Sequence, residues 1–221
     1  MAKKAKNKKK SVQKQTKSIS SQPKSGNDNK KLIFRGLVLV AVMVVLGLFF
    51  YDMLKEDKMK NVVVFETSKG VIKVELDFVN APITSENFAK YVEDQHFDGL
   101  IFHRVIPNFM IQGGGFYRDG TQKSTRDPIK LESNNGLKNT RGTIAMARTM
   151  VEDSATSQFF INVVNNPSLN YAPGNPGYAV FGKVVEGMDV VDEIRFVETS
   201  NREGHGDWPV EDIIITKAYL E

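Results

Sequence analysis

The chain has 221 residues, of which 41% are hydrophobic and 10% aromatic, so it can bury the core of one sizeable domain. It contains no cysteine, which excludes a disulfide framework, a thiol nucleophile and a thiolate-ligated metal. Residues 1–35 hold eleven Lys and one Arg against Asp28, a net +11, so that within the total of +4 the rest of the chain carries −7. The acidic remainder argues against a nucleic-acid-binding domain, because such domains present a basic surface.

The N-terminal quarter of the chain divides into a polar tail and an apolar stretch. Residues 1–31 are rich in Lys, Ser, Gln and Asn, and they predict a disordered Lys-rich tail because they bury too little apolar surface to offset chain entropy. Residues 36–51 read GLVLVAVMVVLGLFFY, sixteen residues without a charge. With the apolar residues on either side, they predict a transmembrane helix over 32–54, followed by a short linker at 55–61.

Two other interpretations of the apolar stretch are a buried core helix and a cleaved signal peptide. A core helix would show a polar stripe, and a cleavage site would need small residues, whereas this stretch ends in bulky ones. We therefore expect an uncleaved signal-anchor. The basic tail should remain cytoplasmic, which predicts a single-pass protein of the cell membrane whose following domain is extracytoplasmic, either periplasmic or extracellular.

Residues 62–221 show the pattern of a folded, mainly β domain. Two β-rich runs at 62–66 and 71–76 flank a turn at 67–70 and predict a hairpin. A helix is expected to open at Pro82, and a second helix to cover 187–195. Further strands are expected at 100–106, 109–112, 129–131, 143–147, 159–163, 179–184 and 212–219. About eight strands and two helices predict an antiparallel barrel or sandwich with helices at its ends.

Three segments of this domain carry unusual residues. They are FHRVIPNFMIQGG at 102–114, AMAR at 145–148 followed by SATSQFFIN at 154–162, and GYAVFGKV at 177–184. Alternate side chains of a strand share a face, so Arg104 is bracketed by large apolar residues on an otherwise dry surface. A single Arg in a strand is usually an ordinary surface residue, and alternating Phe and Met are usually core. The prediction of a functional site therefore depends on the whole motif.

Together the three segments resemble the cyclophilins, in order from about residue 62 to residue 220. The run NNGLKNTRG at 134–142 and the AMART run are most similar to the bacterial branch of that family. The resemblance implies a closed eight-stranded antiparallel barrel capped by two α-helices, with a shallow proline-binding groove. It also implies peptidyl-prolyl cis/trans isomerase activity without a cofactor, on proline-containing unfolded or nascent polypeptides. We expect the isomerase domain to be monomeric and to have no nucleic-acid partner.

The resemblance also assigns roles to individual positions. It places the catalytic arginine at Arg104 and the glutamine that contacts the substrate backbone at Gln112. The implied apolar pocket for substrate consists of Phe109, Met110, Phe160 and Leu169. The implied groove residues are Ala147, Arg148 and Tyr178. Arg148 replaces an asparagine of better-known members of the family, and Tyr178 replaces a histidine.

For the remaining positions the sequence predicts a supporting role, a structural role or no site at all. Gln158 is the eighth residue predicted to be part of the substrate-binding site, and it is expected either to hold Arg104 through a hydrogen bond or to face solvent as an ordinary strand residue. His103, next to Arg104, should point into or across the barrel and have a structural role. No spacing of His, Asp and Glu suggests a metal site. Ser168 occupies the position of a tryptophan that forms part of the cyclosporin site in the family, so tight cyclosporin binding is not expected.

The predicted function is isomerisation of proline peptide bonds during protein folding outside the cytoplasm, with Arg104 hydrogen bonding to the prolyl nitrogen in an apolar groove. One alternative is a membrane-tethered proline-binding chaperone or assembly module with incidental catalysis. Another is a nucleic-acid binder that acts through the basic tail, which the acidic domain disfavours.

Overall fold

The computed structural model describes residues 28–56, 61–202 and 204–221, which form two compact units, Met1–Asp57 and Lys58–Glu221. The first unit contains one helix, α1 (Asp28–Glu56), which extends beyond the predicted 32–54 at both ends. Its window Lys30–Leu48 has 19 residues and a mean hydropathy of 2.3, so it is long and apolar enough to cross a membrane. Residues 1–27 of the predicted tail and 57–60 of the predicted linker lie outside the described residues.

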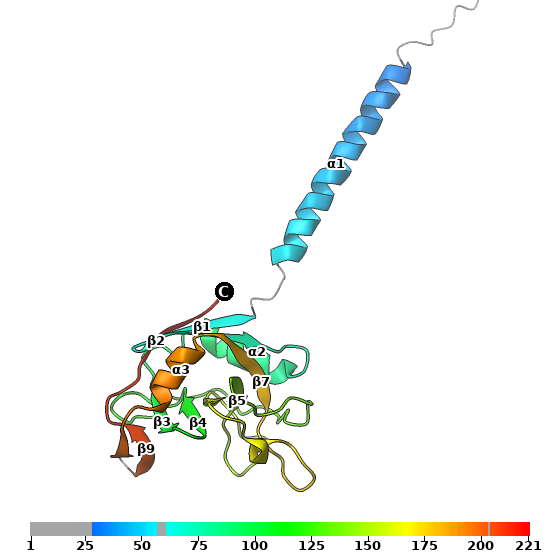
Figure 1. Ribbon diagram of the computed structural model, residues 1–221. Helices are drawn as coiled ribbons and strands as arrows, with labels where there is room; N and C mark the ends of the chain where they lie inside the picture. Colours follow the sequence, from blue (N-terminus) through cyan, green and yellow to red (C-terminus); the bar gives the residue numbers. More distant parts are fainter. Residues whose placement is uncertain (1–27, 57–60, 203) are drawn as a thin grey trace, which may run out of the picture. The chain divides into compact units, whose positions relative to one another are not determined.

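The second unit is mainly β-structure (Figure 1). Its helices are α2 (Pro82–Glu93), α3 (Met188–Arg195) and the short 3₁₀-helix η1 (Pro167–Leu169). Its strands are β1 (Val62–Thr67), β2 (Gly70–Leu76), β3 (Phe102–Ile106), β4 (Met110–Gly113), β5 (Thr143–Met146), β6 (Phe159–Asn162), β7 (Val180–Glu186), β8 (Thr199–Arg202), β9 (His205–Pro209) and β10 (Ile215–Leu220). The hairpin β1–β2 and the helices α2 and α3 confirm the sequence prediction for these parts of the domain.

Eight of the strands form one curled antiparallel sheet in the order β10-β1-β2-β7-β5-β6-β4-β3. Helix α2 packs against β7 and β10, whereas α3 packs against β2, β3 and β4. The remaining strands, β8 and β9, form a separate hairpin that packs against β3. The mainly β domain with two α-helices is therefore as predicted.

The predicted closure of the barrel is wrong. Among the described residues, the two end strands β3 and β10 share no ladder. One isolated bridge pairs Ile101 with Ile214, the residues that directly precede these two strands. Phe102 donates its backbone N–H to the carbonyl of Ile213 at 2.9 Å beside this bridge. Strand β3 itself packs against β4 and β9. The sheet is consequently a half-barrel.

Two further elements differ from the prediction. The strand expected at 129–131 is a single bridge from Ile129 to Ala155, and the backbone N–H of Leu131 donates to the side chain of Asp153 at 2.8 Å. The backbone N–H of Leu131 is therefore satisfied by a side-chain acceptor, and not by the neighbouring strand that the β-rich composition predicted. The β8–β9 hairpin was not predicted, because its residues are polar and glycine-rich and alternate too little to indicate strands.

The core of the domain lies on one face of the sheet, and a smaller apolar cluster lies on the other. Phe65, Phe88, Phe97 and Phe159 are fully buried and pack against one another in the main core, mostly edge to face, with ring centroids 4.9 to 6.2 Å apart. Successive side chains of a strand point to opposite faces, so Phe160 leaves this core. It joins the second cluster on the outer face, which consists of Met110, Ala145, Phe160 and Val180.

Candidate active site

Strand pairing places the residues of the three sequence motifs opposite one another. In the β3–β4 ladder Arg104 faces Gln112, and in the β4–β6 ladder Gln112 faces Phe160. Phe160 in turn faces Ala145 on β5. Directly opposed residues in antiparallel strands lie close enough for their side chains to interact. Four strands, which come from two motifs that are distant in the sequence, thus form one continuous outer surface.

This surface contains a pocket of about 160 Å³. It gathers both predicted catalytic residues and seven of the eight predicted substrate-binding residues: Arg104, Phe109, Met110, Gln112, Ala147, Arg148, Phe160, Leu169 and Tyr178. Only Gln158 of the predicted set lies outside this lining, and it lines the two adjoining hollows instead.

The floor of the pocket is apolar. Met110 and Phe160 are 2% and 4% exposed, and they pack with Ala145 and Val180 in the second cluster. The ring of Tyr178 meets that of Phe160 edge to face, with centroids 5.7 Å apart. A floor of this kind, open on one side, suits a small apolar ring such as that of proline.

Arg148 forms one rim of the pocket and is held by several contacts. Its Nε donates to the carbonyl of Gly177 at 2.9 Å, and a terminal nitrogen donates to the carbonyl of Thr149 at 2.8 Å. Its guanidinium also lies 4.7 Å from the centroid of the Tyr178 ring. These contacts hold the guanidinium of Arg148 in the rim.

Gln158 contacts Gln112, and not Arg104. Nε2 of Gln112 donates to Oε1 of Gln158 at 2.9 Å, and the predicted hydrogen bond between Arg104 and Gln158 is not found among the described residues. The correction follows from the ladders, because Gln112 lies between β3 and β6 and is therefore nearer to the chain that enters β6. Gln158 supports the site through Gln112.

Arg104 makes its ion pair with a residue that sequence reasoning missed. Its Nε lies 3.5 Å from Oδ2 of Asp207 on β9, and the two side chains are 41% and 44% exposed. A second hollow, of about 540 Å³, has both residues in its lining. The available signal was the run Gly204-His205-Gly206-Asp207, whose composition indicates a tight turn but gives no spatial partner.

His103 does not line the pocket, and its ring packs beside the β8–β9 hairpin; the predicted direction, into or across the barrel, stays a prediction. Its ring is buried 4.7 Å from that of Phe116 and 5.9 Å from that of Trp208, measured between centroids. Burial lowers the pKa of His103 to about 4, and electrostatic interactions with His205 and Arg104 act in the same direction. A neutral, buried imidazole has a structural role beside the arginine.

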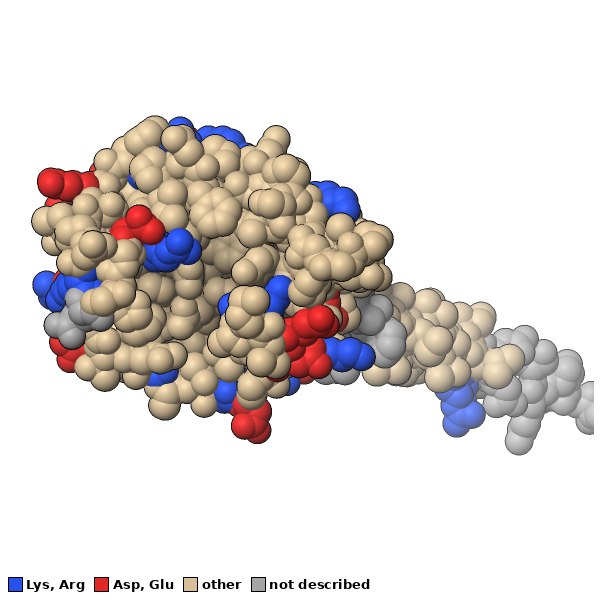
Figure 2. All heavy atoms as spheres, turned by 90° about the horizontal axis from the view of Figure 1, so that it is seen from below, with Lys and Arg blue, Asp and Glu red and all other residues tan. Residues whose placement is uncertain are grey.

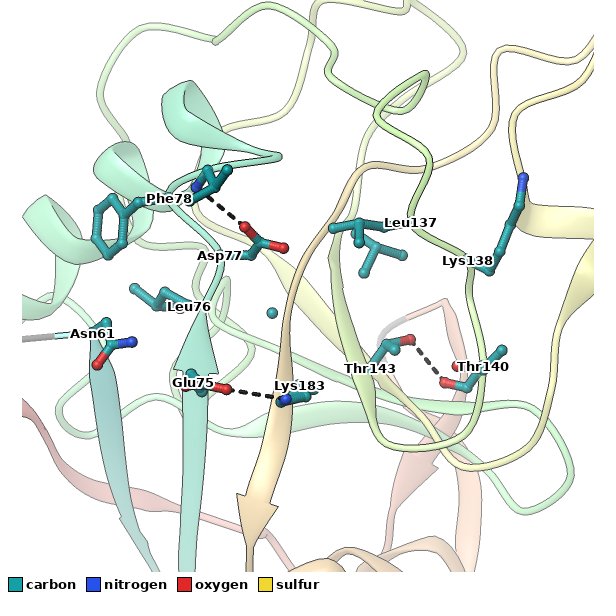
Figure 3. Close-up of a pocket in the computed structure, with 13 residues that line it drawn as sticks. Asn61, Glu75, Leu76, Asp77, Phe78, Leu137, Lys138, Thr140, Thr143 and Lys183 are labelled. Atoms are coloured by element: carbon teal, nitrogen blue, oxygen red, sulfur yellow. Dashed lines mark hydrogen bonds and ion pairs between the residues drawn. The ribbon is translucent and has the colours of Figure 1, made fainter.

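A larger hollow of about 580 Å³ lies elsewhere on the domain, between β2, β7 and the segment 137–143 (Figure 3). None of the ten predicted site residues lines it. Its Lys183 is paired with Glu75 at 3.1 Å, as the dashed line in Figure 3 marks. The smaller pocket, where Arg104 borders an apolar floor, is therefore the better candidate for an active site.

Comparisons with known proteins agree on one family. Residues 62–220 match the sequence profile described as cyclophilin type peptidyl-prolyl cis-trans isomerase/CLD. The chain is 48% identical over 183 residues to peptidyl-prolyl cis-trans isomerase A of Dickeya dadantii (strain 3937), which covers 83% of this chain and 96% of the relative. It is 53% identical over 156 residues to peptidyl-prolyl cis-trans isomerase B of Escherichia coli (strain K12), covering 69% and 95%.

A solved structure gives the same result for the fold. The cyclophilin type isomerase of Cryptosporidium parvum, crystallised in the presence of the dipeptide Ala-Pro, superposes with a TM-score of 0.60 at 26% identity. The match covers 72% of this chain and 98% of that one. With a family profile over most of the chain and bacterial relatives near half identity, the chain belongs to the cyclophilins and is a peptidyl-prolyl cis-trans isomerase.

Proposed function

We propose that this isomerase acts on proline-containing chains outside the cytoplasm, held at the membrane by α1, and that Arg104 is its catalytic residue. The observation that carries the catalytic part is the position of Arg104 at the edge of a pocket whose floor is Met110 and Phe160. A permanent cation beside an apolar slot suits a reaction that moves no proton and forms no covalent bond to the enzyme.

The chemistry explains why this arrangement accelerates isomerisation. Rotation about a peptide bond meets a barrier of about 18–20 kcal/mol because the nitrogen lone pair is delocalised into the carbonyl. In the rotated transition state that lone pair is localised on the prolyl nitrogen. A donor aimed at the nitrogen stabilises the rotated state more than the planar one, and only such differential binding lowers the barrier. A 10⁵-fold acceleration corresponds to about 7 kcal/mol.

In this proposal the apolar floor has two effects. It holds the proline ring, so that the bond that rotates lies next to the guanidinium of Arg104. It also excludes water, and a charged donor interacts more strongly in a dry site than in an aqueous one. Gln112, the cross-strand neighbour of Arg104 in the β3–β4 ladder, is positioned to hold the substrate backbone beside the guanidinium.

The surroundings of the pocket suit a polypeptide substrate better than a nucleic acid. On the face seen in Figure 2 a hollow opens among mostly uncharged side chains, and acidic and basic groups are scattered around it. They do not gather there into a single basic patch. An extended, largely uncharged peptide can enter a groove of this kind without desolvating many charges.

Substitution of Arg104 tests the catalytic assignment. We expect Arg104→Ala in the full chain, measured in detergent with a protease-coupled assay on a proline peptide, to lower kcat/KM by about 100-fold or more. Arg148→Ala is the matched control, because it removes a guanidinium from the other rim of the same pocket. It should lower kcat/KM only a few-fold. Near-normal activity of Arg104→Ala would overturn the proposed mechanism.

The membrane location rests on α1 and on the Lys-rich residues before it. Because the chain has no cysteine, a single introduced cysteine reports its own side of the membrane. Val79 in the domain is 86% exposed and suits Val79→Cys, and Ser18→Cys marks the tail. We expect a membrane-impermeant maleimide to label Val79→Cys in spheroplasts and Ser18→Cys only after permeabilisation. The opposite pattern would contradict the proposed topology.

A further inference from the structure

We propose that Asp207 is a positioning residue for Arg104: its carboxylate fixes the guanidinium in the orientation that faces the proline pocket. This inference rests on the proposed catalytic role of Arg104. It concerns a residue on the β8–β9 hairpin, outside all three sequence motifs and outside the lining of the proline pocket.

The first support is the contact itself. Oδ2 of Asp207 lies 3.5 Å from Nε of Arg104, and this is the one ion pair that Arg104 makes among the described residues. A guanidinium has five N–H donors in a rigid fork. A carboxylate on the Nε side restrains the long side chain and leaves the terminal nitrogens to serve as donors. The contact therefore orients Arg104 without consuming the groups that the reaction needs.

The second support is the backbone at Asp207. Ser200 pairs with Trp208 and Arg202 pairs with His205, so the two residues 206 and 207 on β9 lie opposite the single residue 201 on β8. This is a β-bulge, and bulges redirect side chains next to functional sites. Asp207 also has a φ of 59°, in the left-handed region that residues other than glycine rarely adopt. The hairpin departs from regular structure at the residue that faces Arg104.

The third support is the rigid attachment of the neighbouring residue. Trp208 is fully buried, and its ring lies 5.9 Å from the rings of His103 and Phe116. His103 directly precedes Arg104, as Asp207 directly precedes Trp208. One adjacent pair, His103 and Trp208, thus packs inward while the other pair, Arg104 and Asp207, meets at the surface. The carboxylate is held in a fixed place relative to β3.

The exposure of the pair indicates an effect on catalysis and little effect on stability. Both side chains are about two-fifths exposed, and ion pairs with that much solvent contact contribute little to folding. An unrestrained arginine, however, samples many rotamers, only some of which face the pocket. Removal of the carboxylate should therefore leave the protein folded and its pocket intact, but lower the fraction of time that the donor is aligned.

Asp207→Asn is the sharpest variant, because asparagine keeps the shape of the side chain and tolerates a positive φ. We expect kcat of the full chain to fall about tenfold, as misalignment of a catalytic group does, with KM within about twofold. The melting temperature should stay within about 2 °C of wild type. Asp94→Asn, which breaks an ion pair with Arg126 away from the pocket, is the control and should leave kcat unchanged.

A double-mutant cycle separates this inference from the proposed role of Arg104. If Asp207 acts through Arg104, adding Asp207→Asn to Arg104→Ala should cause no further loss of kcat. An equal loss in both backgrounds would overturn the inference, as would normal kcat in Asp207→Asn alone. A rise in KM alone would assign Asp207 to direct substrate contact and would also overturn it. Normal activity in Arg104→Ala would instead show that the proposed function had failed.

Discussion

Gln112 and Gln158 are joined side chain to side chain, with Nε2 of Gln112 donating to Oε1 of Gln158 at 2.9 Å. Gln112 is also the ladder partner of Arg104. The pair therefore connects the loop that enters β6 to the strand that lies beside Arg104. Gln158 thus contacts Gln112, and not Arg104 as the sequence suggested.

Removal of the acceptor on Gln158 tests this connection. We expect Gln158→Leu to lower kcat/KM about fivefold, because a hydrogen bond of this kind contributes about 1 kcal/mol. Gln158→Glu keeps an acceptor at the same place and should stay within about twofold of wild type. Both variants are measured in the protease-coupled isomerisation assay. Equal activity of the two variants would show that Gln112 does not depend on this bond.

Adjacent glycines next to Gln158 offer a second test. A Cβ on Gly115 would lie 2.7 Å from the side chain of Gln158, which can move aside. A Cβ on Gly114 would lie 2.9 Å from both the Phe159 ring and the carbonyl oxygen of Ser157, and Gly114 has a φ of +83°. We expect Gly115→Ala to lower kcat/KM a few-fold with little loss of stability.

Gly114→Ala serves as the contrasting variant. A clash with backbone and core, added to strain at positive φ, should lower the free energy of unfolding by about 2 kcal/mol or more. Thermal or urea denaturation of both variants measures the difference. A Gly115→Ala protein as destabilised as Gly114→Ala would show that Gln158 is not free to move.

The buried His103 predicts a pH-dependent stability. Its pKa is about 4 in the folded protein, against an ordinary value near 6.5, so between these values the unfolded chain binds more protons. The stability contributed by the neutral imidazole is therefore fully present above pH 6.5 and is lost as the pH falls toward 4. The unfolding free energy should change with a slope of up to about 1.4 kcal/mol per pH unit from this residue.

A variant can separate the contribution of His103 to the pH dependence of the unfolding free energy from the contribution of the carboxylates. His103→Gln removes the titrating group, so its urea-unfolding free energy should vary less steeply between pH 4 and 6.5 than that of wild type. His96, whose pKa burial also lowers to about 4, remains in both proteins and cancels in the comparison. Identical slopes would show that the imidazole of His103 is accessible to protons in the folded state.

Ser168 predicts weak binding of cyclosporin. It lies on η1 next to Leu169, which lines the proline pocket, at the position where the cyclophilin resemblance places a tryptophan of the drug site. We expect Ser168→Trp to tighten cyclosporin binding about tenfold, because a buried aromatic anchor contributes at least that much to an interface. Fluorescence titration measures both proteins. Unchanged affinity would place the drug contacts of this chain elsewhere.

Local patterns were sufficient for the regular parts of the fold. The alternation around the turn at 67–70 predicted the hairpin β1–β2, and the helix signals at Pro82 and at 187–195 predicted α2 and α3. The β8–β9 hairpin could not be predicted in this way, because it depends on burial of Trp208 against β3, a contact between distant segments.

In the candidate site, too, local sequence patterns predicted some residues, whereas others depend on contacts between distant segments. The motifs that carry the resemblance to the cyclophilins contain eight of the nine predicted residues that line one pocket, because consecutive ladders fix their register. The ninth, Leu169, lies between two of the motifs. Asp207 could not be identified, since its relation to Arg104 arises from a bulge and a positive φ on a separate hairpin. The partner of Gln158 was misassigned for a similar reason, because sequence spacing does not show which of two neighbouring strands is nearer.

The central claim is that Arg104 stabilises the rotated prolyl bond more than the planar one. Comparison of catalysis with ground-state binding in Arg104→Ala tests it most directly. Isothermal titration of the variant with a proline peptide should give a Kd within about threefold of wild type, while its isomerisation rate on the same peptide falls about 100-fold. A loss of affinity as large as the loss of rate would show uniform binding and would contradict the claim.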